Sequence, residues 1–542
     1  MSHALSNFLA KLTRRDLFRT GGLLSVPAWF GGSATAQAPA SSGLALGRNI
    51  YQSIGVRPLI NCRGTLTVVG GSLELPEVRA AKDLAGQQFV QLDELMDGIG
   101  KRLAELTGAE WGMVASGCAA ALAHATTACV TGGNPELLVR VPDLTGFAKD
   151  EVVIPKQSRN VYDQAIRSVG VRIIEASDTA QYEAALGPKV AMVYVFAGQR
   201  MENGPLPYDA VYGLAKKKNI PVLVDAAAEM LTVPNVHLQR GATLVGYSGG
   251  KCIRGPQCAG ILLGRKDLLK AAWVCSAPHH GHGRTMKLGK EEAIGMLMAI
   301  EMWMKRNHKA EMATWISWLN NISARVTKIE GVTTAVREPR GLANHSPGLS
   351  ISWDAAKLGI TGEEVSNILY TTEPRIALGG GGGARGRRPG TETGISITAY
   401  MMAPGEDKIV ADRIYSILAA KRSPKTVEPL RAPAGDLTGR WDVSIEYAAG
   451  SSTHSLHVRQ QGSELVGTHQ GDTVTRDFSG TIAGDEVRIA SSVGEMNGAA
   501  LSYRFSGKLD GETMSGTLDM GEYLAAKWTA KRHVFGRQGD PA

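Results

Sequence analysis

Residues 220–264 carry the sequence IPVLVDAAAEMLTVPNVHLQRGATLVGYSGGKCIRGPQCAGILLG, which gives the clearest indication of the fold class. It contains three short apolar runs, IPVLVD, ATLVGYS and AGILLG, each bounded by turn residues. Runs that are apolar at every position are typical of strands covered on both faces, as in a mainly parallel sheet with helices on each side. The stretch therefore predicts an α/β fold.

Apolar runs alternate with helical patterns over residues 45–425. The further strand candidates are WGMVAS, ELLVRVP, DEVVIP, VRIIEA and VAMVYVFA, while AVYGLAKKKN and EEAIGMLMAIEMWMKR have helical spacing. Alternation of this kind is typical of βαβ units around one sheet. We predict a large domain over residues 45–300 and a smaller α+β domain over residues 301–421, with GLSISWD and GISITAY as strands of the second.

The composition changes near the C-terminus. Residues 422–436 are rich in proline and predict a linker. Over residues 437–533, short alternating runs recur between Gly, Asp and Ser turns: RWDVSIEY, HSLHVRQQ, ELVGTHQ, RDFSGTI, EVRIASS, LSYRFSGKL, TMSGTLD and AAKWTAKR. Eight strands at this spacing predict an antiparallel barrel or sandwich. No catalytic constellation stands out in it, so we expect an accessory or interaction domain.

The composition is that of a folded protein of more than one domain, with 542 residues, 43% hydrophobic and 20% charged. The net charge of +8 is spread without basic runs interleaved with aromatic residues, so we expect no nucleic-acid partner. Six cysteines in so long a chain do not indicate a disulfide framework, and their spacing does not suggest a metal site.

Residues 1–38 predict a twin-arginine signal peptide. Arg14 and Arg15 precede the short apolar stretch GGLLSVPAWFGG, and Ala36–Ala38 has the small-residue pattern of a cleavage site. The alternative is an amphipathic first helix with two arginines by chance. This signal predicts a periplasmic or otherwise exported protein, carried by the twin-arginine export machinery. No apolar run reaches the 18 or more residues that a membrane span needs, so we expect no span in the mature form.

Lys251 is the sharpest candidate for chemistry, since it stands on the glycine-rich turn between the runs ATLVGYS and AGILLG. A lysine amine becomes a nucleophile or base when burial or nearby cations lower its pKa. The alternative is a solvated loop lysine. Asp225 ends the run IPVLVD, at the strand edge where ligands bind in open α/β sheets. As an alternative, Asp225 caps a helix.

A possible anion site lies at Ser116, Gly117 and Cys118, between the run WGMVAS and an alanine-rich helix. The free N–H groups at a helix N-terminus bind phosphate, and small residues let the anion approach the backbone. The hydroxyl of Ser248, three residues before Lys251, offers a further contact.

Over residues 48–420 the chain resembles the fold type I pyridoxal-phosphate enzymes, within the group of selenocysteine synthase (L-seryl-tRNA selenium transferase) and D-glucosaminate-6-phosphate ammonia-lyase. The resemblance rests on an ordered set of motifs: INCRGTLTVVGG, LAELTGAEWGMVASGCAAAL, EVVIPKQSRNVYDQAIRSVG, VLVDAAAE, SGGKCIRGPQCAGILLGRKDLL, GRTMKLGKEEAIGML, EPRIAL and MMAPGEDKIVADRIYSIL. It implies pyridoxal 5′-phosphate as cofactor, Lys251 as its Schiff-base lysine, Asp225 as the partner of the ring nitrogen and residues 116–118 as the phosphate cup.

The resemblance also suggests residues that bind the substrate. Arg375 in EPRIAL is at the place of a guanidinium for the substrate carboxylate, although a surface salt bridge is the alternative. Arg159 in KQSRNVYD is expected over the cofactor or on a substrate anion, and the residue that stacks on the cofactor ring stays open. Arg284 and Lys287 in GRTMK are expected near an active site, either that of the same chain or that of a neighbouring subunit, because such enzymes usually form homodimers or larger homo-oligomers.

Residues 379–390, GGGGGARGRRPG, predict a mobile surface insertion, with closure on an anionic substrate as the alternative. For the whole chain we expect an ammonia-lyase or related elimination at the α- and β-carbons of a small amino acid or amino sugar acid. The alternatives are an aminotransferase or racemase, a selenium transferase-like enzyme, and an inactive protein that binds a ligand through the same fold. Export argues against the selenium transferase, because charged tRNA is cytoplasmic.

Overall fold

The computed structural model describes residues 44–47, 50–379, 392–423, 430–495 and 499–535. The predicted signal peptide, most of the glycine-rich segment and part of the proline-rich linker lie outside these residues. The chain divides after Pro58. In the first unit the described residues contain one short 3-10 turn, η1 (Gln52–Ile54), and the second unit, from Leu59 on, holds all of the sheets described below.

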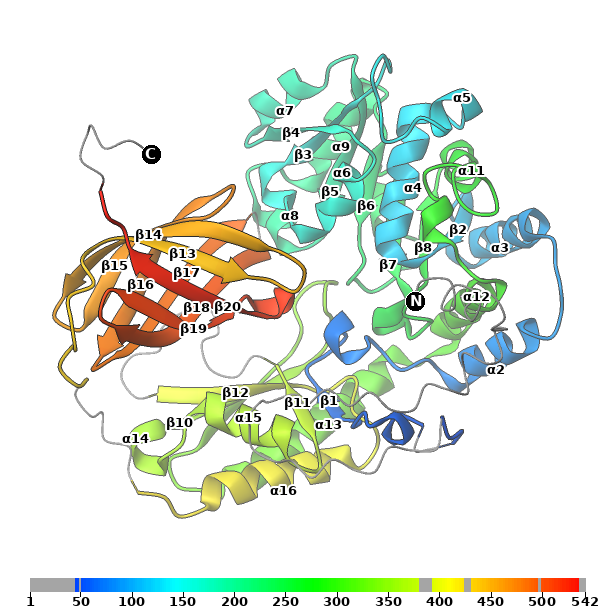
Figure 1. Cartoon of the computed structure of the whole chain (residues 1–542). Helices are drawn as coiled ribbons and strands as arrows, with labels where there is room; N and C mark the ends of the chain where they lie inside the picture. The colour runs from blue at the N-terminus through cyan, green and yellow to red at the C-terminus, as the bar shows by residue number, and fades with distance from the viewer. Residues whose placement is uncertain (1–43, 48–49, 380–391, 424–429, 496–498, 536–542) are drawn as a thin grey trace, which may run out of the picture. The chain divides into compact units, whose positions relative to one another are not determined.

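A seven-stranded sheet forms the centre of the large domain (Figure 1). Its order is β2 (Trp111–Ala115), β8 (Gly260–Gly264), β7 (Leu244–Ser248), β6 (Val222–Asp225), β5 (Val190–Phe196), β3 (Glu151–Pro155) and β4 (Arg172–Ala176). β8 is antiparallel to both of its neighbours, and the pairs from β7 to β4 are parallel. Every residue of β2, β3, β6 and β8 is buried, as fully apolar runs require. The predicted α/β fold is confirmed.

The helices of this domain pack on the sheet and on one another. Their bounds are α2 (Pro76–Ala85), α3 (Leu92–Thr107), α4 (Gly117–Thr131), α5 (Pro135–Leu138), α6 (Gln164–Arg167), α7 (Thr179–Ala185), α8 (Gln199–Asn203), α9 (Tyr208–Lys217), α10 (Val236–Arg240), α11 (Lys266–Val274) and α12 (Lys290–Lys305). α4 is buried over most of its length. α3 lies unusually close to β2, because a Cβ atom at Gly100 would fall 2.0 Å from the Trp111 ring.

One strand prediction was wrong. The run ELLVRVP is not a strand, since its first residues lie in the short helix α5 and the rest in turns. The cause is local, because the Asn134 side chain accepts a hydrogen bond from the Glu136 N–H at 3.0 Å and Pro135 occupies the first helical position. Both are helix-start signals, and they prevail over the apolar character of the run.

The small domain has its own sheet and its own core. Its sheet has the strand order β12 (Glu392–Thr398), β10 (Gly348–Asp354) and β9 (Thr333–Arg337), and β10 is antiparallel to both neighbours. The helices of the domain are α13 (His308–Val326), α14 (Ala355–Leu358), α15 (Gly362–Thr371) and α16 (Glu406–Ala419). β1 (Ile60–Cys62) pairs in parallel with β11 (Ile376–Leu378). Ile60 and Cys62 therefore belong to the core of the small domain, whereas Trp303 of α12 packs in the core of the large one.

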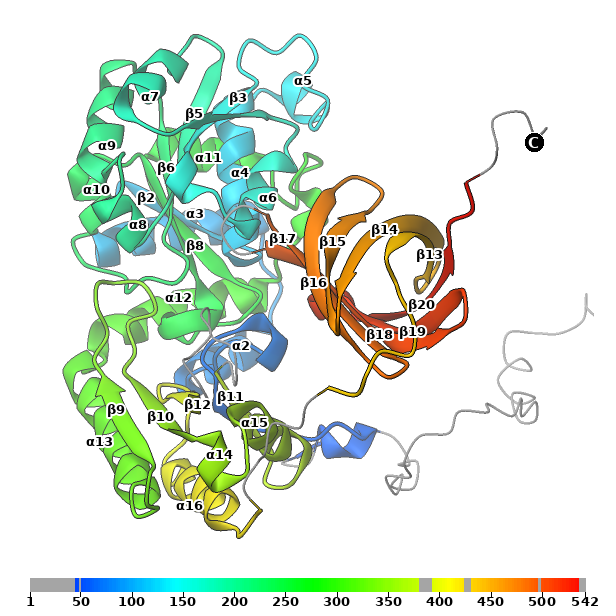
Figure 2. The same cartoon turned by 90° about the vertical axis from the view of Figure 1, so that its left-hand side faces the viewer.

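The predicted C-terminal β-domain is confirmed as a closed barrel (Figure 2). Its eight strands are β13 (Gly439–Glu446), β14 (Ser451–Gln461), β15 (Glu464–Gln470), β16 (Thr475–Ala483), β17 (Glu486–Glu495), β18 (Ala499–Asp510), β19 (Thr513–Asp519) and β20 (Ala525–Arg532). Each strand pairs antiparallel with the next, and β20 closes on β13. Alternate residues point inward, as in Trp441, Val443 and Ile445 of β13, and form a separate apolar core.

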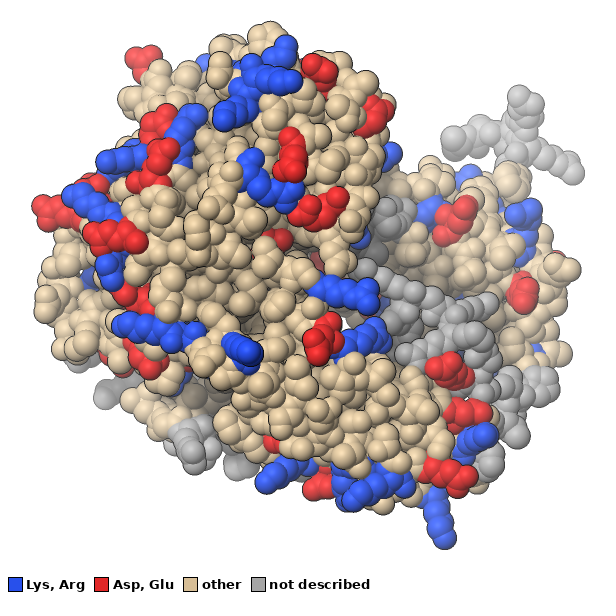
Figure 3. Space-filling view, turned by 180° about the vertical axis from the view of Figure 1, so that it is seen from behind, with Lys and Arg blue, Asp and Glu red and all other residues tan. Residues whose placement is uncertain are grey.

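On the face seen in Figure 3, lysine and arginine side chains alternate with aspartate and glutamate over the described residues. Within the described part of the chain, no helix is long and apolar enough to cross a membrane.

Candidate active site

Lys251 lies on a tight turn that joins β7 to β8. The turn occupies Gly249–Ile253, and the Lys251 backbone is non-helical, with φ −122° and ψ −137°. Glycine is needed at position 249, because a Cβ atom there would lie 2.6 Å from Met296 Sδ and 2.7 Å from the Ala259 carbonyl oxygen. This close packing fixes the turn, and Lys251 lines a cavity.

Asp225 ends β6 and is only 2% exposed. Its Oδ2 accepts a hydrogen bond from the Tyr194 hydroxyl at 2.9 Å, its Oδ1 accepts one from the Ala227 N–H at 3.1 Å, and Cys118 Sγ lies 3.7 Å from Oδ1. Burial raises the pKa of Asp225, and the two hydrogen bonds from Ala227 and Tyr194 oppose that rise. A carboxylate in this setting favours a positively charged partner in the cavity.

The amino terminus of α4 lies at the same cavity. Gly117 and Cys118 line it, and the side chain of the N-cap residue Ser116 makes no capping hydrogen bond. Gly117 has φ +85°, a conformation that favours glycine. The first N–H groups of a helix have no partner within the helix and attract anions. Ser248, at the end of β7, also lines the cavity.

The cavity has a volume of about 550 Å³ and lies between the large and the small domain. Its lining from the small-domain side consists of the segment after β1 together with residues around β10 and β12: Arg63, Gly64, Thr65, Leu66, Thr67, Asn344, Ser346, Pro347, Gly348, Thr398 and Tyr400. The Thr65 and Tyr400 hydroxyls share a hydrogen bond of 2.7 Å, which ties two of these segments together.

Two aromatic rings line the same cavity as Lys251. Tyr162 and Phe196 both line the cavity, with ring centroids 6.5 Å apart and planes inclined by 24°. Lys251 Nζ lies 5.9 Å from the centroid of the Tyr162 ring. The cavity therefore combines an amine, a buried carboxylate, a helix amino terminus and an aromatic wall.

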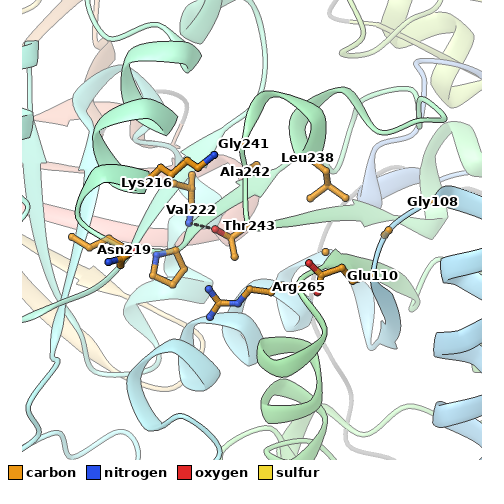
Figure 4. A pocket seen from close by; sticks show the side chains of 14 residues that line it. Gly108, Glu110, Lys216, Asn219, Val222, Leu238, Gly241, Ala242, Thr243 and Arg265 are labelled. Atoms are coloured by element: carbon orange, nitrogen blue, oxygen red, sulfur yellow. Dashed lines mark hydrogen bonds between the residues drawn. The ribbon is translucent and has the colours of Figure 1, made fainter.

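A second hollow of about 390 Å³ lies at the opposite edge of the sheet (Figure 4). It is lined by Val222 and Thr243, near the amino ends of β6 and β7, and by Arg265 just beyond β8. The Thr243 hydroxyl accepts a hydrogen bond from the Val222 N–H at 2.9 Å there. Ligands of open α/β sheets bind at the carboxyl ends of the parallel strands, so the cavity at Lys251 is the candidate active site.

Several curated proteins are similar to this chain, although no protein-family model matches it. D-Glucosaminate-6-phosphate ammonia lyase of Salmonella typhimurium (strain 14028s / SGSC 2262) is 29% identical over 381 residues, 68% of this chain and 98% of that protein. A 5′-C-glycyluridine monooxygenase-decarboxylase of a Streptomyces species is 31% identical over 300 residues, 52% of this chain and 72% of that protein. An L-seryl-tRNA(Sec) selenium transferase of Moorella thermoacetica is 28% identical over 343 residues, 56% and 69% of the two chains.

A solved structure of D-glucosaminate-6-phosphate ammonia-lyase matches the fold with a TM-score of 0.60 and 28% identity, over 69% of this chain and 99% of that one. The chain belongs to the fold type I group of pyridoxal-phosphate enzymes. The family resemblance predicted from the motifs is thus confirmed, and so is the prediction that the protein is an enzyme.

The residues of this fold type I enzyme fit the cofactor of its group. The 2% exposed carboxylate of Asp225 calls for a cationic partner, which a protonated ring nitrogen supplies. The uncapped amino terminus of α4 suits a phosphate. The cavity volume also lies within the roughly 300–1,000 Å³ of small-molecule sites. Five predicted residues, Lys251, Asp225, Gly117, Cys118 and Ser248, line this one cavity, and Ser116 directly precedes the lining segment.

Arg159 does not line the cavity of the fold type I enzyme, contrary to the expectation that it covers the cofactor or binds a substrate anion. It is 7% exposed, its Nε donates to Asp163 Oδ2 at 2.6 Å, and its Nη1 pairs with Glu175. Two carboxylates therefore hold the guanidinium within the large domain.

The other predicted substrate residues are also away from the cavity lining. The Arg375 guanidinium packs 4.0 Å above the Tyr370 ring, and its Nε donates to the Tyr370 carbonyl at 3.0 Å. Arg284 and Lys287 are exposed on the segment of η6 (Arg284–Met286). Of the glycine-rich segment, residues 380–390 lie outside the described residues.

Sequence reasoning missed Arg63, Tyr162, Asn344 and Tyr400, which all line the cavity. Two of them had a usable signal. Arg63 directly follows β1, at a strand end, and Tyr162 stands three residues beyond Arg159 in the motif KQSRNVYD. The other two lie in the small domain, and only its placement beside the sheet brings them to Lys251.

Proposed function

We propose that this enzyme binds pyridoxal phosphate and catalyses elimination at the α- and β-carbons of a small amino acid or amino sugar acid, as an ammonia-lyase. The observation that carries this proposal is the single cavity shared by Lys251, the buried carboxylate of Asp225 and the amino terminus of α4. The similarity to an ammonia lyase along 98% of that protein's length supports the reaction class.

Four elements of the chain would hold the cofactor. Lys251 Nζ would carry it covalently, and Asp225 would hold a proton on its ring nitrogen. The N–H groups at the start of α4, with Ser248, would bind its phosphate, and Tyr162 would cover one face of the ring. When bound, the cofactor supplies an electron sink for the charge left by removal of a substrate proton.

Lys251 is the natural proton carrier in this arrangement, because it is the lysine in the described lining of the cavity that would hold the cofactor. It would take a proton from the substrate α-carbon and return it to the leaving group or product. Its turn is held by close packing at Gly249, so the backbone that presents the Lys251 side chain to the cavity is fixed. The walls from the two domains would exclude water from the reacting atoms.

Arg63 is our candidate for the substrate anion, in place of Arg375. Its side chain lines the cavity, whereas Arg375 does not, and a guanidinium binds carboxylate or phosphate oxygens in a bidentate manner. Arg63 directly follows Cys62, the last residue of β1, which pairs with Leu378 of β11.

We also propose that the enzyme assembles as a homodimer or larger homo-oligomer. An apolar groove between α2, α3 and α12, which includes Leu84, Val90 and Met298, supports this, and the neighbouring Phe89 side chain is fully exposed. Leu84→Glu should lower the molar mass measured by light scattering to that of a monomer. The matched control Val139→Glu, at an exposed residue outside the groove, should leave the mass unchanged.

Export remains part of the proposal. The twin arginines and the cleavage pattern in residues 1–38 support a periplasmic enzyme. The wild type should be recovered from the periplasm cleaved after Ala38, and Arg14→Lys with Arg15→Lys should stay uncleaved in the cytoplasm. Uncleaved wild type found only in the cytoplasm would contradict export.

A substrate screen on purified protein loaded with the cofactor tests the reaction class. We expect release of ammonia and a keto acid in equal amounts, without an added amino acceptor, and no release by Lys251→Ala. Dependence on an acceptor would indicate an aminotransferase, and inversion without ammonia a racemase. Oxygen uptake with release of carbon dioxide would resemble the Streptomyces relative instead. The absence of any conversion, with the cofactor bound, would favour an inactive binding protein.

A further inference from the structure

The C-terminal barrel contains an unexpected row of polar side chains in its interior. His454, His469, Arg476, Ser491 and Tyr503 come from five consecutive strands, β14 to β18. Each stands an even number of positions from an apolar core residue of its own strand, so its side chain points into the barrel as that residue's does. Register places His469 opposite Arg476 and Ser491 opposite Tyr503. The row therefore spans five of the eight strands of the barrel.

The two histidines of this row form a hydrogen-bonded chain with a serine. His454 Nδ1 and His469 Nε2 lie 2.9 Å apart, and His469 Nδ1 lies 2.7 Å from Ser491 Oγ. All three residues are at most 3% exposed. Burial lowers the pKa of both histidines, that of His469 to about 3, so both rings are neutral at pH 7.

Arg476 is then a buried cation beside neutral groups. It is 7% exposed, its Cζ lies 4.7 Å from the centroid of the Tyr503 ring, and its Nη1 donates to the Leu501 carbonyl at 3.4 Å. Within the described residues no carboxylate pairs with it, and its buried Nε makes no hydrogen bond. A guanidinium removed from water without a counter-charge is costly, and an anion offsets that cost.

His454 offers a second donor at the same place. If Ser491 donates to His469 Nδ1, then His469 Nε2 donates to His454 Nδ1, and His454 Nε2 carries a hydrogen directed outward. That nitrogen is buried and makes no hydrogen bond within the described residues. The carboxylate oxygen Asp472 Oδ2 lies 3.5 Å from this nitrogen, on a residue whose side chain is 62% exposed.

Gly471, which has no side chain, lies beside these two donors. A Cβ atom at Gly471 would lie 3.4 Å from His454 Cε1 and 3.6 Å from Arg476 Nη2. Farther along the same strands the interior is filled by apolar side chains, which include Leu465, Ile482 and Val487. An eight-stranded barrel is wide enough for one small ligand, so only a small group can reach the row.

We propose that this end of the barrel is a binding site for the oxyanion group, carboxylate or phosphate, of a small molecule. Arg476 and His454 donate to the anion, and Tyr503 forms part of the wall. A metal ion does not suit this place, because the guanidinium charge of Arg476 would repel it. The site is independent of the cavity at Lys251, since none of its residues lines that cavity.

Histidine-ring NMR on the full chain tests the proposal. The protein has 12 histidines, and the Cε1–H signals of His454 and His469 are assigned by their loss in His454→Gln and His469→Gln. Inorganic phosphate and acetate are titrated separately at constant ionic strength, with chloride as the balancing salt. We expect a saturable shift of both signals with one or both probes, and the stronger probe identifies the anion class.

Four variants make the result specific. Arg476→Gln should weaken binding at least about tenfold, because it removes a charge-assisted donor. Arg504→Gln, an exposed arginine of the same barrel, is the matched control and should bind as the wild type does. Gly471→Val keeps every charge but fills the space, so it should abolish the shift. Asp472→Asn removes a repelling carboxylate and should tighten binding.

The absence of a saturable shift in the wild type with either probe would overturn the proposal. Equal affinities of the wild type and Arg476→Gln would do so as well. If Arg476→Gln does not fold, Gly471→Val and Asp472→Asn decide, and unchanged binding in both contradicts the site.

Discussion

Lys251 Nζ lies 5.9 Å from the centroid of the Tyr162 ring, although the two residues are far apart in the sequence. Tyr162 belongs to the short helical segment after β3, and Lys251 to the turn after β7. Both segments follow the carboxyl ends of parallel strands, the edge of an open α/β sheet at which ligands bind. An aromatic face is thus placed beside the amine that would carry the cofactor.

Tyr162→Ala should weaken cofactor binding. The loss of about 1 kcal/mol of stacking raises the dissociation constant about fivefold, whereas Tyr162→Phe should retain the affinity. Titration of cofactor-free protein, followed by absorbance, measures this. Tyr370→Ala, at an exposed ring outside the cavity, is the control. An unchanged dissociation constant in Tyr162→Ala would show that this ring does not cover the cofactor.

Asp225→Asn should reduce kcat by about 10²-fold or more, because an amide would no longer hold a proton on the cofactor's ring nitrogen and the electron sink would weaken. The same change should alter the pH dependence of stability in cofactor-free protein. Burial raises the pKa of Asp225 in the folded state, so the wild type loses stability as pH rises from the ordinary aspartate pKa through the raised one. Thermal melts from pH 4 upward measure that loss, and it should be absent in Asp225→Asn.

Arg63→Gln should raise KM about 10- to 100-fold with little change in kcat, because the guanidinium binds substrate and transition state alike. Arg375→Gln should change KM by less than about twofold, since its side chain packs on Tyr370 outside the cavity. Steady-state kinetics on the best substrate of the screen separate the two. A large rise in KM for Arg375→Gln and none for Arg63→Gln would show that Arg375, not Arg63, binds the substrate anion.

Gly100→Ala should destabilise the large domain by about 1–3 kcal/mol, because its Cβ atom would overlap the Trp111 ring. Gly98→Ala, on the same helix and with open space around it, should instead be neutral or stabilise by up to about 1 kcal/mol. Thermal unfolding of the pair compares one substitution in two settings. Equal shifts in Tm would mean that α3 and β2 are not in this close contact.

Local patterns were sufficient to predict most of the fold. Fully apolar runs indicate the strands of the central sheet, which are buried on both faces, and alternating runs indicate the strands of the barrel, which are buried on one face. ELLVRVP failed because Asn134 and Pro135, just before it, start a helix. The closure of the barrel was left open, since strand spacing does not distinguish a barrel from a sandwich.

The site could be predicted only where it depends on strand ends. Asp225 and Ser248 end neighbouring parallel strands, with Lys251 on the following turn, so their meeting follows from the sheet. Arg159 could not be placed, because Glu175, which holds it, comes from a different strand. Arg63 follows β1, which was predicted within the large domain but pairs with β11 in the small one, and this pairing could not be read from the sequence.

Borohydride reduction of the loaded protein, followed by proteolysis and mass spectrometry, shows whether Lys251 carries the cofactor. We predict that the peptide containing Lys251 carries the reduced cofactor, and that Lys251→Ala carries none. Attachment at another lysine, or no attachment after reconstitution of the wild type, would contradict the claim.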